Sequence, residues 1–239
     1  YPNTDWYEHV YRNALITGHN LSIRGGSEKL SSFLSLNYLK QEGIITNTDA
    51  ERFGMRANLE YKVNSWLKVG ARLNYIRRNS QEPFDLSRVF FIQSGAAPFI
   101  APYTRDGRFG SVEAIAQDGT LLYDNRNPLI DASNGATKTT LDYMSLNAFA
   151  TVDFTKDLNL QVTWASNGNW KMVDKYNETL YGYTDSGIET MTINYNRDGL
   201  EMSREQISTM RNNFHATLNY SKKFVEKHSV AGILGAQLE

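Results

Sequence analysis

Five polar side chains stand at even spacings in two neighbouring stretches of the sequence and could bind a polar ligand. They are Arg52, Arg56 and Asn58 in the first stretch and Arg72 and Asn74 in the second. Guanidinium and amide groups donate hydrogen bonds to the oxygen atoms of a sugar or a peptide. These residues could therefore line a substrate path or hold a plug, although pairing among themselves in a polar interior is the simpler interpretation.

A second group of residues with possible binding chemistry is aromatic and lies in the long stretch 79–140. An exposed aromatic ring can stack on the C–H face of a sugar ring, and it can also contact a partner protein. Packing of the stretch against its neighbours or a partner is the simpler interpretation, but a connection this long is usually functional or folded on itself. The candidates for contact with a substrate or partner are Phe99, Tyr103, Phe109 and Tyr123.

Oxygen-bearing side chains in the same stretch raise the question of a metal site. Calcium prefers carboxylate and amide oxygens, but the spacing here differs from that of an EF-hand loop. Turn formation at Asp118-Gly119 and Asn134-Gly135 explains these residues better, so the sequence predicts no metal site. The residues concerned are Asp118, Asp124, Asn125, Asn127 and Asp131.

Catalytic motifs are absent from the sequence. It contains no Gly-x-Ser-x-Gly nucleophile motif, no phosphate-binding glycine loop and no zinc-binding helix motif. It has no cysteine, which excludes a thiol nucleophile and a Cys-based zinc site. The histidines, His9, His19, His215 and His228, have no metal-ligand spacing. The sequence therefore predicts a protein that is not an enzyme and has no cofactor.

The elements that must position the polar residues are β-strands. From Glu51 to Asn64, apolar and polar residues alternate without exception, and 66–78 repeats the pattern. A period of two is typical of a strand, whose successive side chains point to opposite faces of the sheet. The same pattern predicts about eight strands, at 19–26, 29–40, 51–63, 66–78, 141–155, 158–170, 206–222 and 228–239.

The connections between these predicted strands alternate between short and long. Short turns fall at 27–29, 64–65, 155–157 and 225–228, and longer connections fall at 41–50, 79–140 and 171–205. This alternation puts all short turns at one end of an up-and-down sheet, as in outer-membrane barrels, whose long loops are extracellular. We therefore expect an all-β fold, a transmembrane antiparallel up-and-down β-barrel, with long extracellular loops near 79–140 and 171–205.

Aromatic residues on the apolar faces predict a girdle at each membrane interface. From Phe53 to Tyr61 the rise is ~26 Å along the strand, or ~20 Å along the membrane normal at a tilt of ~40°. This rise is close to the ~25 Å apolar band of outer-membrane barrels. The lipid-facing residues are expected to be Tyr38, Phe53, Tyr75 and Trp164 toward the long loops and Tyr61, Phe154 and Tyr220 toward the short turns.

The cost of burying charge in lipid decides which face points outward. A slip of the third predicted strand by one residue would turn Arg52, Arg56, Glu60 and Lys62 toward lipid. Each Arg or Lys costs ~2–4 kcal/mol near the midplane of the bilayer and less near its edges. The polar face should therefore point into a wet lumen or onto a polar plug.

Composition excludes several other classes of protein. The formal net charge is -1, so there is no basic field that would attract nucleic acid. No run approaches 18 consecutive apolar residues, which excludes a transmembrane helix. The first residues carry no targeting signal, and both ends look like cuts through a longer protein, so we expect a fragment.

Several segments resemble the barrel of the SusC/RagA family of TonB-linked outer-membrane transporters. They are Asn3 to Tyr7, His19 to Lys29, Ser35 to Ile44 and Trp66 to Tyr75, which together cover about residues 1–78. The resemblance implies a 22-stranded barrel with an amino-terminal plug, driven through TonB and capped by a SusD-like surface lipoprotein. It implies import of large nutrients such as oligosaccharides or peptides, but this chain contains no recognisable plug.

The sequence therefore predicts part of the barrel of an active nutrient importer in the outer membrane of a Gram-negative cell. Its expected partners are membrane lipid, a SusD-like lipoprotein, TonB through parts outside this chain, and an oligosaccharide or peptide substrate, with no nucleic acid. One alternative is a soluble all-β carbohydrate-binding or adhesin module, whose aromatic residues would serve recognition. A third possibility is a passive porin, which differs from the importer by the absence of a plug and a TonB contact.

Overall fold

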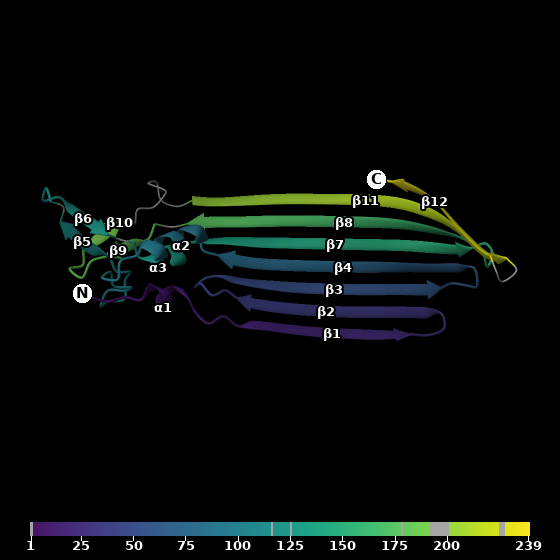
Figure 1. Ribbon diagram of the computed structural model, residues 1–239, viewed down its shortest axis with the longest axis horizontal. Helices are drawn as coiled ribbons and strands as arrows, with labels where there is room; N and C mark the ends of the chain where they lie inside the picture. Colours follow the sequence, from purple (N-terminus) through teal and green to yellow (C-terminus); the bar gives the residue numbers. More distant parts are fainter. Residues whose placement is uncertain (1, 116, 125, 178, 192–200, 225–227) are drawn as a thin grey trace.

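The computed structural model describes residues 2–115, 117–124, 126–177, 179–191, 201–224 and 228–239. Its main element is an antiparallel eight-stranded sheet in which the strands lie side by side in chain order (Figure 1). The strands are β1 (Ile16–Gly26), β2 (Leu30–Glu42), β3 (Asp49–Lys62), β4 (Leu67–Glu82), β7 (Ala136–Asp153), β8 (Leu158–Asn177), β11 (Glu201–Phe224) and β12 (His228–Leu238).

The eight predicted strands are confirmed, but several are longer than the sequence predicted. β7 begins at Ala136 and β11 at Glu201, while β8 continues to Asn177. The predicted bounds for these ends were 141, 206 and 170. The prediction was short because polar residues at these strand ends interrupt the alternation of apolar and polar positions, although the hydrogen-bonded pairing continues.

Pairing between neighbouring strands keeps all apolar faces on the same side of the sheet. Ala57 stands opposite Leu73, which stands opposite Leu146. The adjacent row, on the other face, contains Arg56 opposite Asn74. Because side chains alternate between faces, this register gives the sheet one apolar and one polar surface.

Short turns join the strands at one end of the sheet (Figure 1). In the turn between β3 and β4, the Asn64 side-chain oxygen accepts hydrogen bonds from the amides of Trp66 and Leu67, at 3.0 and 2.8 Å. The Ser27 hydroxyl accepts one from the Leu30 amide at 3.2 Å. These side chains satisfy backbone donors that the reversal leaves unpaired. The predicted turn at 225–228 lies mostly outside the described residues.

The long connections fold into a small structure at the opposite end of the sheet, here called the end cap (Figure 1). The sequence pattern predicted none of its elements, which are too short to show a period. They are α1 (Trp6–Val10), α2 (Leu86–Gly95), α3 (Pro128–Ser133), β5 (Val112–Ile115), β6 (Leu121–Asp124), β9 (Tyr181–Tyr183) and β10 (Glu189–Met191).

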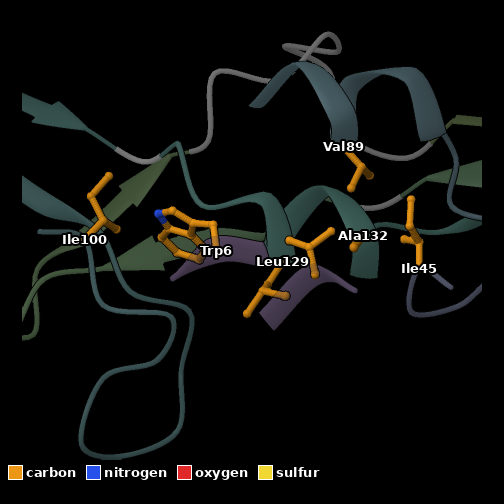
Figure 2. Close-up of a cluster of buried hydrophobic side chains, with 7 residues drawn as sticks. Trp6, Ile45, Val89, Ile100, Leu129 and Ala132 are labelled. Atoms are coloured by element: carbon orange, nitrogen blue, oxygen red, sulfur yellow. The ribbon is translucent and has the colours of Figure 1, made fainter. Parts of the chain in front are cut away.

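The hydrophobic core lies in the end cap and its junction with the sheet, as Figure 2 shows. Trp6 packs with Ile100 and Leu129, and its indole Nε1 donates to the carbonyl oxygen of Ala97 at 3.0 Å. Outward apolar side chains of the sheet have no such cover, and Leu59 is 49% exposed. None of the described helices is long and apolar enough to cross a membrane.

Candidate membrane-facing and substrate-facing surfaces

The apolar belt of the sheet, formed by its outward apolar side chains, lies nearer the short turns on β11 than on β3, although Trp170 of β8 is still in register with Phe53. The position of β11 in register with Phe53 of β3 is Ser208. The first aromatic residue of β11 on this face, counted from the long loops, is Phe214, six residues nearer the short turns. Six residues correspond to ~20 Å along a strand, and the four steps between β3 and β11 correspond to ~19 Å across the sheet.

The other edge of the apolar belt shifts in the same direction. Ala216 of β11 is in register with Tyr61 of β3, whereas the predicted girdle residue of β11, Tyr220, lies four residues nearer the short turns, and Phe224 follows it on the same face. Four residues correspond to ~13 Å along the strand. If both edges follow membrane interfaces, the strands tilt by about 35° to 46° from the membrane normal, the range of transmembrane barrels.

The long-loop edge of the apolar belt ends in a polar cluster on the outward face. Arg77 Nε and the Tyr75 hydroxyl both donate to Asp142 Oδ1, at 2.7 and 2.6 Å. Toward the same edge, the rings of Tyr38 and Phe53 lie 4.8 Å apart between centroids. Aromatic rings beside paired charges are typical of the zone where hydrocarbon gives way to polar headgroups.

All seven predicted girdle residues occupy positions whose side chains belong to the outward, apolar face of the sheet. Phe154, Tyr61 and Tyr220 lie at the short-turn end, and Phe154 is just beyond the end of β7. Trp164 stacks on Phe214, with ring centroids 6.5 Å apart. Their contact with lipid stays a prediction that agrees with their position.

The five predicted polar residues lie on the opposite face, and the register brings them together. Arg56 stands opposite Asn74, and Asn58 opposite Arg72. The Arg72 guanidinium lies over the ring of Phe149, 4.8 Å from its centroid. Phe149 in turn covers Gly70, where an added Cβ would lie 2.4 Å from the ring.

Arg52 has a different neighbour from the other predicted residues. It stands directly opposite Arg78 of β4, which the sequence analysis did not select. Arg24 of β1 was also missed, and it lies 5.6 Å from the ring centroid of Phe33 on the same face. The alternation of side chains within each strand could have placed both arginines on the polar face. Their neighbours on adjacent strands could not be predicted in this way, because these depend on the register between the strands.

The four aromatic loop candidates have different surroundings. Phe99 is 44% exposed and borders a pocket of about 460 Å³ that Ser111, Glu113 and Asp185 also line. Tyr103 is exposed and stacks on Phe109, with centroids 5.8 Å apart. Phe109 packs against the hydrophobic core. The side chain of Tyr123 lies outside the described residues. Phe99 is thus the candidate best placed to meet a ligand.

Next to this pocket, a short turn carries a paired charge. Arg108 Nε donates to Asp106 at 2.7 Å, and the Thr104 hydroxyl also donates to that carboxylate. These bonds lower the pKa of Asp106 to about 2. The Arg108 guanidinium also lies 3.9 Å from the ring centroid of Tyr183. The turn at residues 104–108, which precedes β5, therefore packs against the β9–β10 hairpin.

The oxygen-bearing residues that the sequence analysis weighed as a calcium site have structural partners. Asn127 caps α3 by accepting from the Leu129 amide at 3.1 Å, and its amide donates to Pro102 and Gly110 carbonyls at 2.8 and 3.1 Å. Asp131 accepts from Arg88 Nε at 2.7 Å, and burial raises the pKa of its carboxyl despite that partner.

Turn chemistry is confirmed at Asp118, whose carboxylate accepts from the Thr120 amide at 2.9 Å beside Gly119 at a φ of 82°. Asn125 and the side chain of Asp124 lie outside the described residues. Within the described part of the chain, no three His, Asp or Glu side chains are grouped as metal ligands.

Comparisons with known proteins extend the resemblance seen in the sequence. No family model matches the chain. It is 41% identical over 75 residues to TonB-dependent receptor P26 of Formosa agariphila, covering 31% of this chain and 8% of that protein. It is 39% identical over 57 residues to TonB-dependent receptor SusC of Bacteroides thetaiotaomicron, covering 24% of this chain and 6% of that protein.

Longer matches have lower identity. TonB-dependent receptor P39 of Formosa agariphila is 23% identical over 229 residues, covering 92% of this chain and 19% of that protein. The solved RagAB peptide transporter matches in fold, with a TM-score of 0.70 and 18% identity, over 99% of this chain and 25% of that one.

The chain thus spans less than a quarter of the length of these curated relatives. Sequence matches and fold point to the same group. In sequence the chain is similar to stretches of TonB-dependent receptors, SusC among them, and in fold it is similar to part of the RagAB peptide transporter.

Proposed function

We propose that this chain forms part of the barrel wall of an importer in the outer membrane of a Gram-negative cell. The importer takes up large nutrients, oligosaccharides or peptides, with energy delivered through TonB. A SusD-like lipoprotein covers its outer opening, and the end cap, including the connections near 79–140 and 171–205, faces the outside of the cell. The plug and the contact with TonB belong to parts of the protein outside this chain.

The diagonal apolar belt is the observation that carries this proposal. A sheet that packs on a protein core has no reason to displace its apolar band by ~13–20 Å between β3 and β11. A bilayer imposes such a shift, because flat interfaces cut tilted strands at a different residue on each strand. The polar opposite face then lines the lumen, where water or a plug satisfies its donors.

The names of the relatives support import rather than adhesion. The relatives in sequence are named TonB-dependent receptors, and the relative in fold is named a peptide transporter. A soluble module would need a cover for the apolar face, and Leu36 and Leu59 remain exposed in the sheet. A passive porin would share the barrel wall and differ in its independence from TonB.

Site-directed labelling tests the proposed orientation. This stretch contains no cysteine, so single cysteines can be introduced into a full-length protein from which cysteines elsewhere are removed. A membrane-impermeant maleimide should label Gln117→Cys in the end cap on intact cells. Lys156→Cys, in the short turn after β7, should react only after the outer membrane is permeabilised. The reverse pattern would contradict the proposed orientation.

Uptake measurements separate the importer from the porin. Cells that express the full-length protein should accumulate a large labelled nutrient, and loss of TonB should abolish the accumulation. Uptake that continues unchanged without TonB would support passive flow through an open barrel. A full-length protein that stays dispersed without detergent, and is absent from membrane fractions, would support the soluble alternative.

A further inference from the structure

The polar face of the sheet carries a strong excess of positive charge. On β1 to β4 this face presents seven cationic side chains and two acidic ones. The opposite face of the same strands presents two cationic and three acidic side chains, and the whole chain has a formal net charge of -1. The seven cationic residues are Arg24, Arg52, Arg56, Lys62, Lys68, Arg72 and Arg78.

Most of these arginines lack an internal counter-charge. Within the described part of the chain, Arg52, Arg56, Arg72 and Arg78 form no ion pair, whereas the outward-facing Arg77 is paired with Asp142 at 2.7 Å.

Arg52 and Arg78 stand directly opposite each other across β3 and β4. Like charges in directly opposed positions destabilise a sheet unless an anion lies between or beside them. This arrangement therefore points to an anionic ligand that comes from outside the sheet.

Amide side chains fill the positions next to the arginines. Two adjacent rows cross the polar face from β3 to β11, and we call them the arginine–asparagine band. Amides both donate and accept hydrogen bonds, as hydroxyl groups require. The first row is Arg56, Asn74, Ser145, Asn167 and Arg211, and the second is Asn58, Arg72, Asn147, Ala165 and Asn213.

We propose that the arginine–asparagine band, with Arg52 and Arg78 beside it, binds acidic oligosaccharides on their way through the barrel. The guanidinium groups bind carboxylate or sulfate groups of the sugar, and the amides bind its hydroxyl groups. This inference rests on the proposed function, since it takes the polar face as the lumen. A channel lined by charge of one sign also concentrates ligands of the opposite sign.

An acidic oligosaccharide fits this surface better than an acidic peptide does. The band contains five asparagines and, apart from the half-buried Ala165, no apolar side chain, so it offers partners for the hydroxyl groups of a sugar rather than for the apolar side chains of a peptide. Apolar groups of the same face border the band at Phe33, Ile76, Tyr143 and Phe149, and guanidinium groups already lie over the rings of Phe33 and Phe149.

Calorimetric binding to the full-length transporter tests the proposal. The acidic probes are a hexamer of galacturonic acid and a sulfated maltohexaose, and the neutral controls are the methyl ester of the first and unmodified maltohexaose. The acidic probes should bind more tightly than their controls, and added salt should weaken only the acidic ones. Arg56→Gln with Arg72→Gln should raise the Kd of the acidic probes roughly tenfold or more.

Two further variants keep this test specific. Lys40→Gln removes one positive charge from the outward face of β2 and should leave every Kd unchanged. Arg56→Lys keeps the charge and loses the planar pair of donors, so it should weaken acidic probes less than Arg56→Gln does. If the double variant Arg56→Gln with Arg72→Gln cannot be extracted as a folded barrel, the binding measurements are made on Arg56→Lys alone.

Several outcomes would overturn the inference. Equal affinity for acidic and neutral probes would do so, as would an equal loss of both in the double variant. Acidic peptides such as hexaglutamate binding with the same arginine dependence would refute the sugar assignment. If carboxylates of the same protein occupied the arginines, acidic probes would gain no affinity and the double variant would instead lower the unfolding temperature.

The binding test stays separate from the test of the proposed function. Failure of TonB-dependent uptake for every nutrient, with arginine-dependent binding intact, would refute transport alone. Uptake of neutral oligosaccharides only, with no preference for acidic probes in binding, would refute the anionic selectivity and leave transport standing.

Discussion

The sheet and the end cap are stabilised in opposite ways, although one chain forms both. Among the residues that the structure describes, every buried apolar residue except Ala136, at the start of β7, lies outside the eight long strands. The end cap therefore excludes water from a small core, as a soluble domain does. The sheet exposes its apolar side chains, and in the proposed function the hydrocarbon of a membrane covers them. One chain can thus contain a region that buries its apolar residues in a core and a region that places them on its surface, and the hydrophobic pattern of the sequence differs between the two regions.

The largest expected effect tests the core of the end cap. Trp6→Ala removes a buried indole and its hydrogen bond to Ala97, which should destabilise the end cap by about 3–5 kcal/mol. Hydrogen exchange on the full-length protein should then speed up in α2 and α3 and stay unchanged in β3 and β4. Tyr7→Ala, at an exposed position of α1, is the matched control. Equal acceleration in the sheet would show that the two regions are not independent.

A charge placed on either face of one strand tests the solvent of the sheet. Leu146→Arg puts a guanidinium into the apolar belt and should destabilise the barrel by about 2–4 kcal/mol. Ser145→Arg, the adjacent residue on the polar face, should change stability little. The measurement is urea unfolding of the full-length protein in lipid vesicles. Similar losses from both substitutions would contradict the assignment of the two faces.

Removal of a buried amide tests the polar part of the end cap. Asn127 is fully buried and makes three hydrogen bonds, to the Leu129 amide and to the carbonyl oxygens of Pro102 and Gly110. Asn127→Ala should cost the end cap about 1–3 kcal/mol because these groups lose their partner in a dry site. Proteolysis of intact cells should cleave the 79–140 connection faster, whereas Asn58→Ala on the sheet should not change the cleavage.

The smallest effect concerns pH in the turn at Asp106. Its folded pKa of about 2 lies below the unfolded value of ~3.9, so its contribution is complete above pH ~4 and is lost as pH falls toward 2. Arg108→Gln should move this titration up toward ~3.9. A fluorophore on Arg105→Cys would report the midpoint in both proteins. An unchanged midpoint would show that Arg108 does not set this pKa.

The sheet could be predicted from the sequence because its two faces differ along the central part of most strands. Phe53 to Val63 alternate with polar neighbours, and that contrast alone gives strand, face and solvent. The prediction failed near Ala136 and Glu201, because polar residues there interrupt the alternation while the strand pairing continues. The position of Arg52 opposite Arg78 could not be predicted either, because it depends on the register between β3 and β4.

The end cap could not be predicted by the same means. α1 and α3 contain five and six residues, too few to show a helical period. The contact between Trp6 and Ala97 joins positions 91 residues apart, and local sequence carries no sign of it. Asn127 and Asp131 were considered as calcium ligands and set aside in favour of turn formation. In the structure Asn127 caps α3 and Asp131 forms an ion pair with Arg88.

The bond from Trp6 to Ala97 has a mechanical consequence. A second hydrogen bond runs from the Asn47 amide to the Ala132 carbonyl oxygen at 2.9 Å, and Trp6, Ile45, Leu129 and Ala132 belong to one hydrophobic cluster. The segment before β1, the β2–β3 connection and α3 are therefore held together at this end of the sheet. We expect these three segments to move as one unit under load, so a displacement of this end should occur around them rather than between them.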